Sequence, residues 1–157
     1  MGLFGFIKEA GEKLFGSGEA HAAGTDPAAN AKAGEAIRNY IVALKLAPTD
    51  LAIAFDGASS TVTVSGTAPD QATKEKILLA AGNVAGVGQV NDQMTVSAPA
   101  AEARFHTVVR GDTLSAIAKQ YYGNANKYPA IFEANKPMLS HPDKIYPGQV
   151  LRLPAEG

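Results

Sequence analysis

Few residues of this sequence could carry covalent or acid–base chemistry. The chain of 157 residues contains no cysteine, which excludes thiolate catalysis, disulfides, zinc fingers and iron–sulfur clusters together. Its three histidines, His21, His106 and His141, are too scattered along the sequence to indicate a metal site. No G-x-S-x-G motif surrounds a serine that could act as a nucleophile. We therefore expect that the protein is not an enzyme.

A glycine-rich stretch offers a different kind of chemistry, the binding of an ion by backbone oxygens. The segment ILLAAGNVAGVGQV ends an expected helix at Gly82 and continues through Gly86 and Gly88. The last carbonyls of a helix lack intrahelical partners, and the helix dipole favours a cation there. Glycines can adopt backbone conformations that aim several carbonyls at one point, and a ring of carbonyls can replace the water shell of K⁺. The alternative is a plain helix end followed by a tight turn, which the residues alone favour.

The composition excludes several other ligands. Fourteen basic and fifteen acidic residues give a formal net charge of −1, without the basic excess that nucleic-acid binding requires. No loop of the D-x-[DN]-x-[DN]-G type is present for calcium. No stretch approaches the roughly 18–20 apolar residues of a membrane span, and the first residues lack the features of a secretory signal. We expect a cytoplasmic protein with no nucleic-acid partner and no stable membrane insertion.

The elements around the glycines follow the order α-β-β-α-β over residues 26–97. A first helix begins after Asp26, which is a suitable N-cap and precedes a proline. Two stretches that alternate between apolar and small or polar residues then predict a β-hairpin. Asp70 opens a second helix that stops at Gly82, and residues 87–96 suit a final strand. This order predicts a small sheet with helices packed on one face.

A second module follows the Ala-rich segment 98–104, which contains no large apolar residue and is expected to be a linker. Residues 105–154 have the order β-α-α-β. Gly123 stops the first of the two helices, and Pro137 follows the end of the second. The fold class is therefore α+β, with two small and different domains.

The first 15 residues form a segment of their own, joined to the rest by a flexible linker at residues 16–25. Apolar residues and one glycine recur in it at helical spacing: Leu3, Phe4, Ile7, Gly11, Leu14 and Phe15. Its polar residues mix both signs of charge, unlike the basic face that anionic lipid favours. We expect a short helix docked on its own protein, and the alternative is a helix that lies on a membrane surface.

Both modules resemble known domain families. The second contains V-x-x-G-D-T-L, I-x-x-A-N and I-x-P-G-Q-x-L and resembles a LysM domain over its whole length. The first, with VTVSGTAPDQATKEKILLAAGNVAGVGQV, resembles a BON domain. A BON domain followed by a LysM domain, led by MGLFGFIKEAGEKLF, is similar to a family of small cytoplasmic potassium-binding proteins.

The resemblance implies a K⁺ sensor or buffer that compacts when the ion binds, with the LysM domain closing against the BON domain. It also implies a site made of backbone carbonyls where the N-terminal segment meets the BON domain. In this sequence the candidate carbonyls belong to Ile7, Ala10, Gly82, Val84 and Val87. Rb⁺ and Cs⁺ are further candidate ions, and we expect a monomer.

An alternative function follows from the LysM resemblance, because LysM domains usually bind N-acetylglucosamine chains such as peptidoglycan. The protein would then be a peptidoglycan-binding envelope protein. The corresponding groove residues here are Gly111, Asp112, Thr113 and Leu114, together with Ile145, Pro147 and Gly148. Turns and a helix cap require the same residue types, so these residues would be retained even in a vestigial groove that no longer bound sugar.

Overall fold

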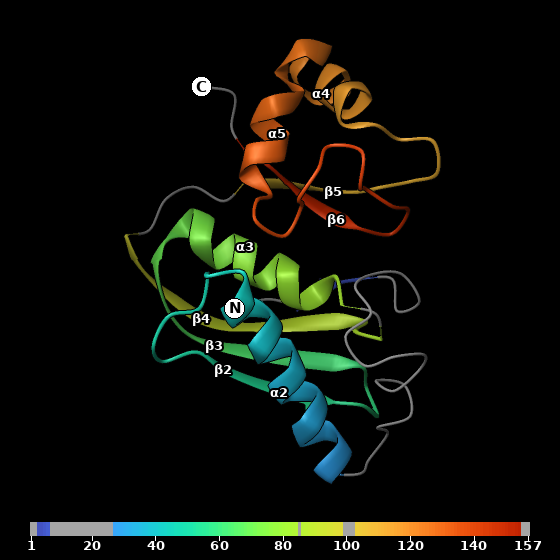
Figure 1. Ribbon diagram of the computed structural model, residues 1–157. Helices are drawn as coiled ribbons and strands as arrows, with labels where there is room; N and C mark the ends of the chain where they lie inside the picture. Colours follow the sequence, from blue (N-terminus) through green and yellow to red (C-terminus); the bar gives the residue numbers. More distant parts are fainter. Residues whose placement is uncertain (1–2, 7–26, 85, 99–102, 155–157) are drawn as a thin grey trace.

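The computed structural model describes residues 3–6, 27–84, 86–98 and 103–154. These residues form two α+β units stacked on each other (Figure 1). The larger unit contains a four-stranded sheet and two long helices, and the smaller contains a two-stranded sheet and two short helices. None of the described helices is long and apolar enough to cross a membrane.

The larger unit has the α-β-β-α-β order that its sequence predicts. Its elements are α2 (Pro27–Ala43), β2 (Ala52–Asp56), β3 (Thr61–Asp70), α3 (Gln71–Gly82) and β4 (Gln89–Ala98). Strands β2 and β3 form an antiparallel hairpin, whereas β4 pairs with β3 in parallel. The parallel pairing requires a crossover between the two strands, and α3 provides it. Because of this crossover, the loop that follows α3 leads directly into a central strand.

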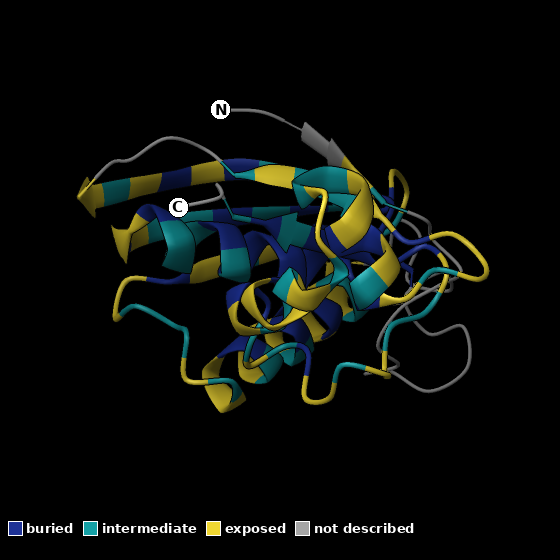
Figure 2. Cartoon of the chain, turned by 90° about the horizontal axis from the view of Figure 1, so that it is seen from above, coloured by how far each residue is buried: buried dark blue, intermediate teal, exposed yellow. Residues whose placement is uncertain are grey.

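The core of the larger unit lies between this sheet and the helices α2 and α3. Helix α2 buries Ile37 and Ile41, two residues of its apolar stripe, and β3 buries Val62 and Val64. Figure 2 shows buried and exposed positions alternating along the strands. Helix α3 begins at an N-cap, Asp70, whose carboxylate accepts a 2.7 Å hydrogen bond from the backbone N–H of Thr73. Hydrogen bonds from Thr73 lower the pKa of this carboxyl group.

The helix predicted near the N-terminus is wrong for the residues that the structure describes there. Leu3–Gly5 form strand β1, which pairs antiparallel with the edge of β4, so the sheet order is β1-β4-β3-β2. A short helix that contains glycines is marginal on its own. The open edge of β4 instead offers unpaired backbone groups to the segment. The rest of the predicted helix, residues 7–15, lies outside the described residues.

The smaller unit confirms the predicted β-α-α-β order. Strands β5 (Arg104–Thr107) and β6 (Val150–Leu153) pair antiparallel, and α4 (Leu114–Tyr122) and α5 (Tyr128–Ala134) pack on them. A 3-10 turn at Ala125–Lys127, which the sequence did not predict, joins the helices.

The two units meet where β6 lies against α3 (Figure 1). Glu75 of α3 is 2% exposed and forms an ion pair with Arg152 of β6, with 2.6 Å between Oε1 and Nε. The other carboxylate oxygen accepts hydrogen bonds from the Gln71 side chain and from the backbone N–H of Ala103, both at 3.1 Å. All of these contacts are made to the buried carboxylate of Glu75. Polar groups therefore help to fix the relative position of the two units, in addition to apolar packing.

We expect Arg152→Met to destabilise the protein by about 3–5 kcal/mol, since it leaves the Glu75 carboxylate buried without its charged partner. Urea unfolding measures this loss. The double variant Glu75→Gln/Arg152→Met should recover most of it, because the uncompensated charge is then gone. As a control, Lys136→Met removes the exposed pair with Glu133 and should change stability by about 1 kcal/mol or less. Equal effects of the two single variants would contradict the prediction.

Candidate cation site

The glycine-rich loop between α3 and β4 is a compact, buried turn. Asn83 caps α3, and its backbone N–H donates to the carbonyl of Leu79 at 2.9 Å. The N–H of Val87 then donates to the carbonyl of Val84 at 3.1 Å. Gly86 has a φ of 95°, a conformation that favours glycine over residues with a side chain. The backbone freedom expected from the sequence is therefore used at this position.

Two other segments hold the loop in place. The backbone N–H groups of Gly88 and Gln89 both donate to the carbonyl of Ser60, at 2.7 and 3.1 Å. The N–H of Phe6, just after β1, donates to the carbonyl of Gly88 at 2.8 Å. The N-terminal segment thus contacts the loop through a direct backbone hydrogen bond.

The ring of Phe6 explains why position 82 is a glycine. A Cβ added to Gly82 would lie 2.1–2.5 Å from three carbon atoms of that ring. Gly82 is helical, and Gly88 is not among the glycines with positive φ. Only Gly86 of the three glycines therefore has an unusual backbone conformation, whereas at Gly82 the ring of Phe6 occupies the space that a side chain would need.

The charges around the loop suit a monovalent cation held by backbone oxygens. Val84, Gly86, Val87 and Gly88 are buried and carry no charge, and the last turn of α3 has no basic side chain. Within residues 3–6, 27–84, 86–98 and 103–154, no group of three or more His, Cys, Asp or Glu could hold a metal ion. The negative end of the α3 dipole therefore faces a loop with backbone carbonyls and without a competing positive charge. Backbone carbonyls are donors that a large, weakly hydrated ion such as K⁺ accepts, whereas Ca²⁺ calls for several carboxylates.

Three of the five predicted carbonyl ligands lie at the end of α3 or in the loop that follows it. Gly82, Val84 and Val87 lie within six residues of each other and are all buried. Ile7 and Ala10 lie outside the described residues. The backbone of Phe6, the residue before Ile7, is hydrogen-bonded to the loop.

The nearby carboxylate of Asp92 is already paired. Asp92 lies on β4 and is buried, and one of its oxygens is 2.9 Å from Nζ of Lys74. The other oxygen accepts the backbone N–H of Met94 at 2.9 Å. These partners give the carboxylate a structural role in the sheet.

The predicted sugar-binding residues of the smaller unit have structural partners. Asp112 accepts the backbone N–H of Val109 and contacts Nε2 of His106, both at 2.9 Å. The hydrogen bond from Val109 is the main reason that the pKa of Asp112 is lowered, and His106 adds to it. Gly111 has a φ of 92° in the same turn, and Thr113 caps α4 by accepting the N–H of Ala116. Leu114 is buried in the core.

An open groove of about 440 Å³ lies beside the start of α4. Its lining residues are Thr113, Leu114, Ser115, Tyr128, His141, Pro142 and Asp143. Only two of the predicted residues, Thr113 and Leu114, line it. Sequence reasoning missed the other five, although the turn residues His141-Pro142-Asp143 are a signal for a loop that could close a groove.

The predicted loop Ile145–Gly148 lies apart from the lining of this groove. The hydroxyl of Tyr146 donates to the carbonyl of Asn83 at 3.4 Å, which ties this loop to the larger unit. The N–H of Gly148 donates to the carbonyl of Val108 at 2.8 Å. Of the predicted set, only Thr113 and Leu114 line this groove, while Gly148 is bonded to Val108, next to the turn that holds Gly111 and Asp112.

Comparisons with known proteins agree with this architecture. The family model of the BON domain matches residues 30–98, and that of the LysM domain matches residues 106–154. The potassium binding protein Kbp of Escherichia coli is 47% identical over 156 residues, which cover 99% of this chain and 100% of that protein. Shorter matches include an uncharacterized protein of Deinococcus radiodurans, 49% identical over 31% of this chain and 19% of that protein. An esterase of Mycobacterium tuberculosis is 50% identical over 29% of this chain and 10% of its own length.

We expect Gly82→Ala to displace the ring of Phe6 while the core stays folded, because the ring can rotate away more easily than the helix can shift. Amide hydrogen exchange should then be faster at the N–H of Phe6 and unchanged at Val62 and Val64. Gly5→Ala is the matched control, since a Cβ at that position meets nothing within 4 Å. Unchanged protection at Phe6 in Gly82→Ala would contradict this account of the glycine.

Proposed function

The chain belongs to the family of the potassium binding protein Kbp, with a BON domain followed by a LysM domain, and on this basis we propose that it is a cytoplasmic K⁺ sensor or buffer. The observation that carries the proposal is the loop after α3, where a helix end, a buried glycine turn and the N-terminal segment meet. In this proposal the ion binds as a ligand, and the protein compacts around it.

The proposed ligands are the backbone carbonyls of Gly82, Val84 and Val87, with those of Ile7 and Ala10 from the N-terminal segment. When the ion is bound, its positive charge offsets the mutual repulsion of carbonyl dipoles that point at one place. The protein supplies the arrangement. Gly86 allows the turn, Ser60 anchors the end of the loop, and the ring of Phe6 covers the backbone of Gly82 and keeps water from it.

We propose binding rather than catalysis. Kbp, the relative that spans the whole chain, is named for binding potassium. In the LysM domain, His106 is held between the hydroxyl of Tyr121 and the carboxylate of Asp112, at 3.0 and 2.9 Å. This histidine links β5 to α4 and to the turn that precedes α4, which gives the His106 side chain a structural role.

A second candidate function rests on the groove beside α4. It combines the half-exposed ring of Tyr128 with polar side chains, including His141 and Asp143. Such a mixture suits a sugar chain, which offers both apolar ring faces and hydroxyl groups. Binding of N-acetylglucosamine chains, as in an envelope protein, is therefore the alternative to be tested beside K⁺.

Calorimetric titration with KCl should give saturable binding heat, and Rb⁺ and Cs⁺ are the next ions to test. NaCl at matched ionic strength should give little heat. Na⁺ is smaller and holds its water more strongly, so carbonyls spaced for K⁺ cannot replace its hydration shell. Equal heats for K⁺ and Na⁺ would overturn the proposal. The same titration with N-acetylglucosamine oligomers tests the alternative.

K⁺ should also reduce the radius of gyration in solution scattering and raise the melting temperature. An ion that binds only the compact form stabilises that form by about 2.7 kcal/mol when its concentration is a hundredfold above Kd. Deletion of residues 1–15 should abolish both responses, because it removes two proposed ligands together with Phe6. A truncated protein that still compacts with K⁺ but not with Na⁺ would place the site elsewhere. The scattering profiles also report whether the protein is a monomer.

A further inference from the structure

Asn83 lies at the centre of the proposed ion site without being one of its ligands. It is the residue between Gly82 and Val84, it caps α3, and its side chain is buried. Its backbone N–H closes the last turn of the helix on Leu79. The peptide bond that carries the carbonyl of Gly82 is therefore the one that leads into Asn83.

The side chain of Asn83 binds the LysM domain. Its Oδ1 accepts the backbone N–H of Val150, and its Nδ2 donates to the carbonyl of the same residue, both at 2.9 Å. One amide thus satisfies both backbone groups of Val150 on β6, as a neighbouring strand would do. The same Nδ2 is 3.4 Å from Sδ of Met138, and the Asn83 carbonyl accepts the hydroxyl of Tyr146 at 3.4 Å.

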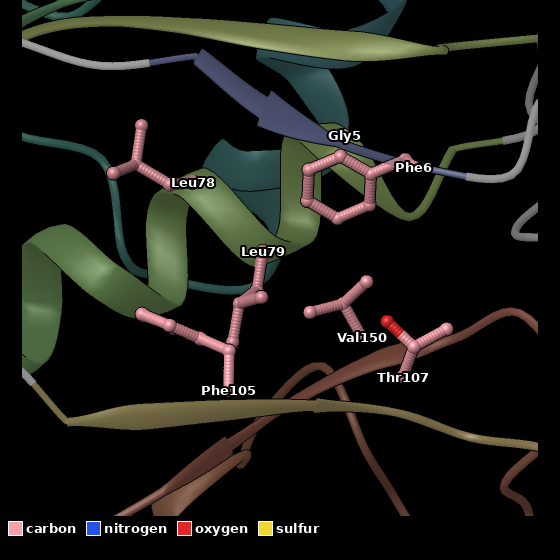
Figure 3. Close-up of a pocket in the computed structure, with 7 residues that line it drawn as sticks. All are labelled: Gly5, Phe6, Leu78, Leu79, Phe105, Thr107 and Val150. Carbon is pink, nitrogen blue, oxygen red and sulfur yellow. The ribbon is translucent and has the colours of Figure 1, made fainter.

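These contacts join the loop to the LysM domain at a second point besides the ion pair of Glu75. Figure 3 shows Val150 of β6 opposite the end of α3, across a cavity from the ring of Phe6. That cavity has a volume of about 150 Å³ and is lined mainly by apolar residues of α3, β5 and β6. The N-terminal segment and the LysM domain therefore reach the end of α3 together, the first at Gly82 and the second at Asn83.

We propose that Asn83 is a positioning residue for K⁺, through which docking of the LysM domain sets the geometry of the carbonyls at Gly82 and Val84. The proposal rests on the K⁺-binding function proposed above. The side chain has its hydrogen-bond partners on β6 only while the LysM domain is docked. Because a buried amide is costly to leave without partners, undocking disturbs the position of Asn83. Docked β6 then holds the Asn83 backbone, and with it the two flanking peptide groups.

The coupling must be reciprocal, because a docked domain that increases ion affinity is itself stabilised by the ion to the same extent. The backbone N–H of Val150 reports this directly, since its acceptor is Oδ1 of Asn83. Its exchange with solvent requires the contact with the larger unit to open. Bound K⁺ should therefore slow this exchange, and Na⁺ should not.

Asn83→Leu tests the proposal in the full-length chain, because leucine has a similar size but forms neither hydrogen bond. We expect the K⁺ affinity to fall about tenfold, within the range typical of coupled sites. Asn124→Leu is the matched control. It removes an asparagine whose Oδ1 accepts the N–H of Asn126 in the turn between α4 and α5, and it should leave the affinity unchanged. Circular dichroism establishes that both variants are folded.

The outcomes distinguish this inference from the function on which it rests. If the unaltered protein shows no K⁺-specific heat, the proposed function fails. If the unaltered protein binds K⁺ but Asn83→Leu binds equally well, the role of Asn83 is overturned. In the unaltered protein, exchange at Val150 that is slowed by K⁺ supports the coupling, and exchange that is the same in K⁺ and Na⁺ overturns it even if the variant does not fold.

Discussion

The close approach of an aromatic ring to a helix backbone is the constraint that joins the N-terminal segment to the end of α3. The ring of Phe6 fills the space that a side chain at Gly82 would need. With the ring there, the N–H of Phe6 reaches the carbonyl of Gly88, and β1 lies along the free edge of β4. One glycine therefore allows the N-terminal segment, the end of α3 and the start of β4 to meet at the same place.

The contact between the domains follows a different principle, because it relies on buried polar groups. The carboxylate of Glu75 and the amide of Asn83 both lie on α3 and both bind β6, two turns apart. Burying such groups adds little net stability over apolar packing, but each has a strong geometric requirement for its partner. They select one docked arrangement of the LysM domain on α3. The LysM domain thus contacts α3 along its length, and the N-terminal segment contacts the same helix at its end.

This arrangement gives the proposed ion site a position that neither domain could provide alone. The loop at residues 82–88 belongs to the BON domain, yet Phe6 covers one side of it and Val150 is bonded to its second residue. A site built from backbone carbonyls depends on the exact placement of peptide groups. Contacts from outside the loop can control that placement, and the structure has them on both sides.

The sequence alone was sufficient to predict the order of the main helices and strands within each domain and the two domain families. Helix α2 begins after Asp26, α3 begins at its N-cap Asp70, and α4 ends at Gly123, all as local residue types indicate. These features depend on capping, periodicity and backbone freedom over a few neighbouring residues, which are properties a sequence carries directly. The individual K⁺ ligands, in contrast, stay a prediction.

Only the tertiary structure decided how distant segments meet. The residues Leu3–Gly5 have helical periodicity, but they form a strand because the edge of β4 is available to them. Tyr128 and residues 141–143 line the groove beside α4 together with Thr113 and Leu114, and Tyr146 of the following loop is bonded to Asn83 of the other domain. Gly82 ends α3 as predicted, and in addition the ring of Phe6 lies against its backbone. In each case the deciding partner lies more than 15 residues away in the chain, and such contacts leave no local pattern in the sequence.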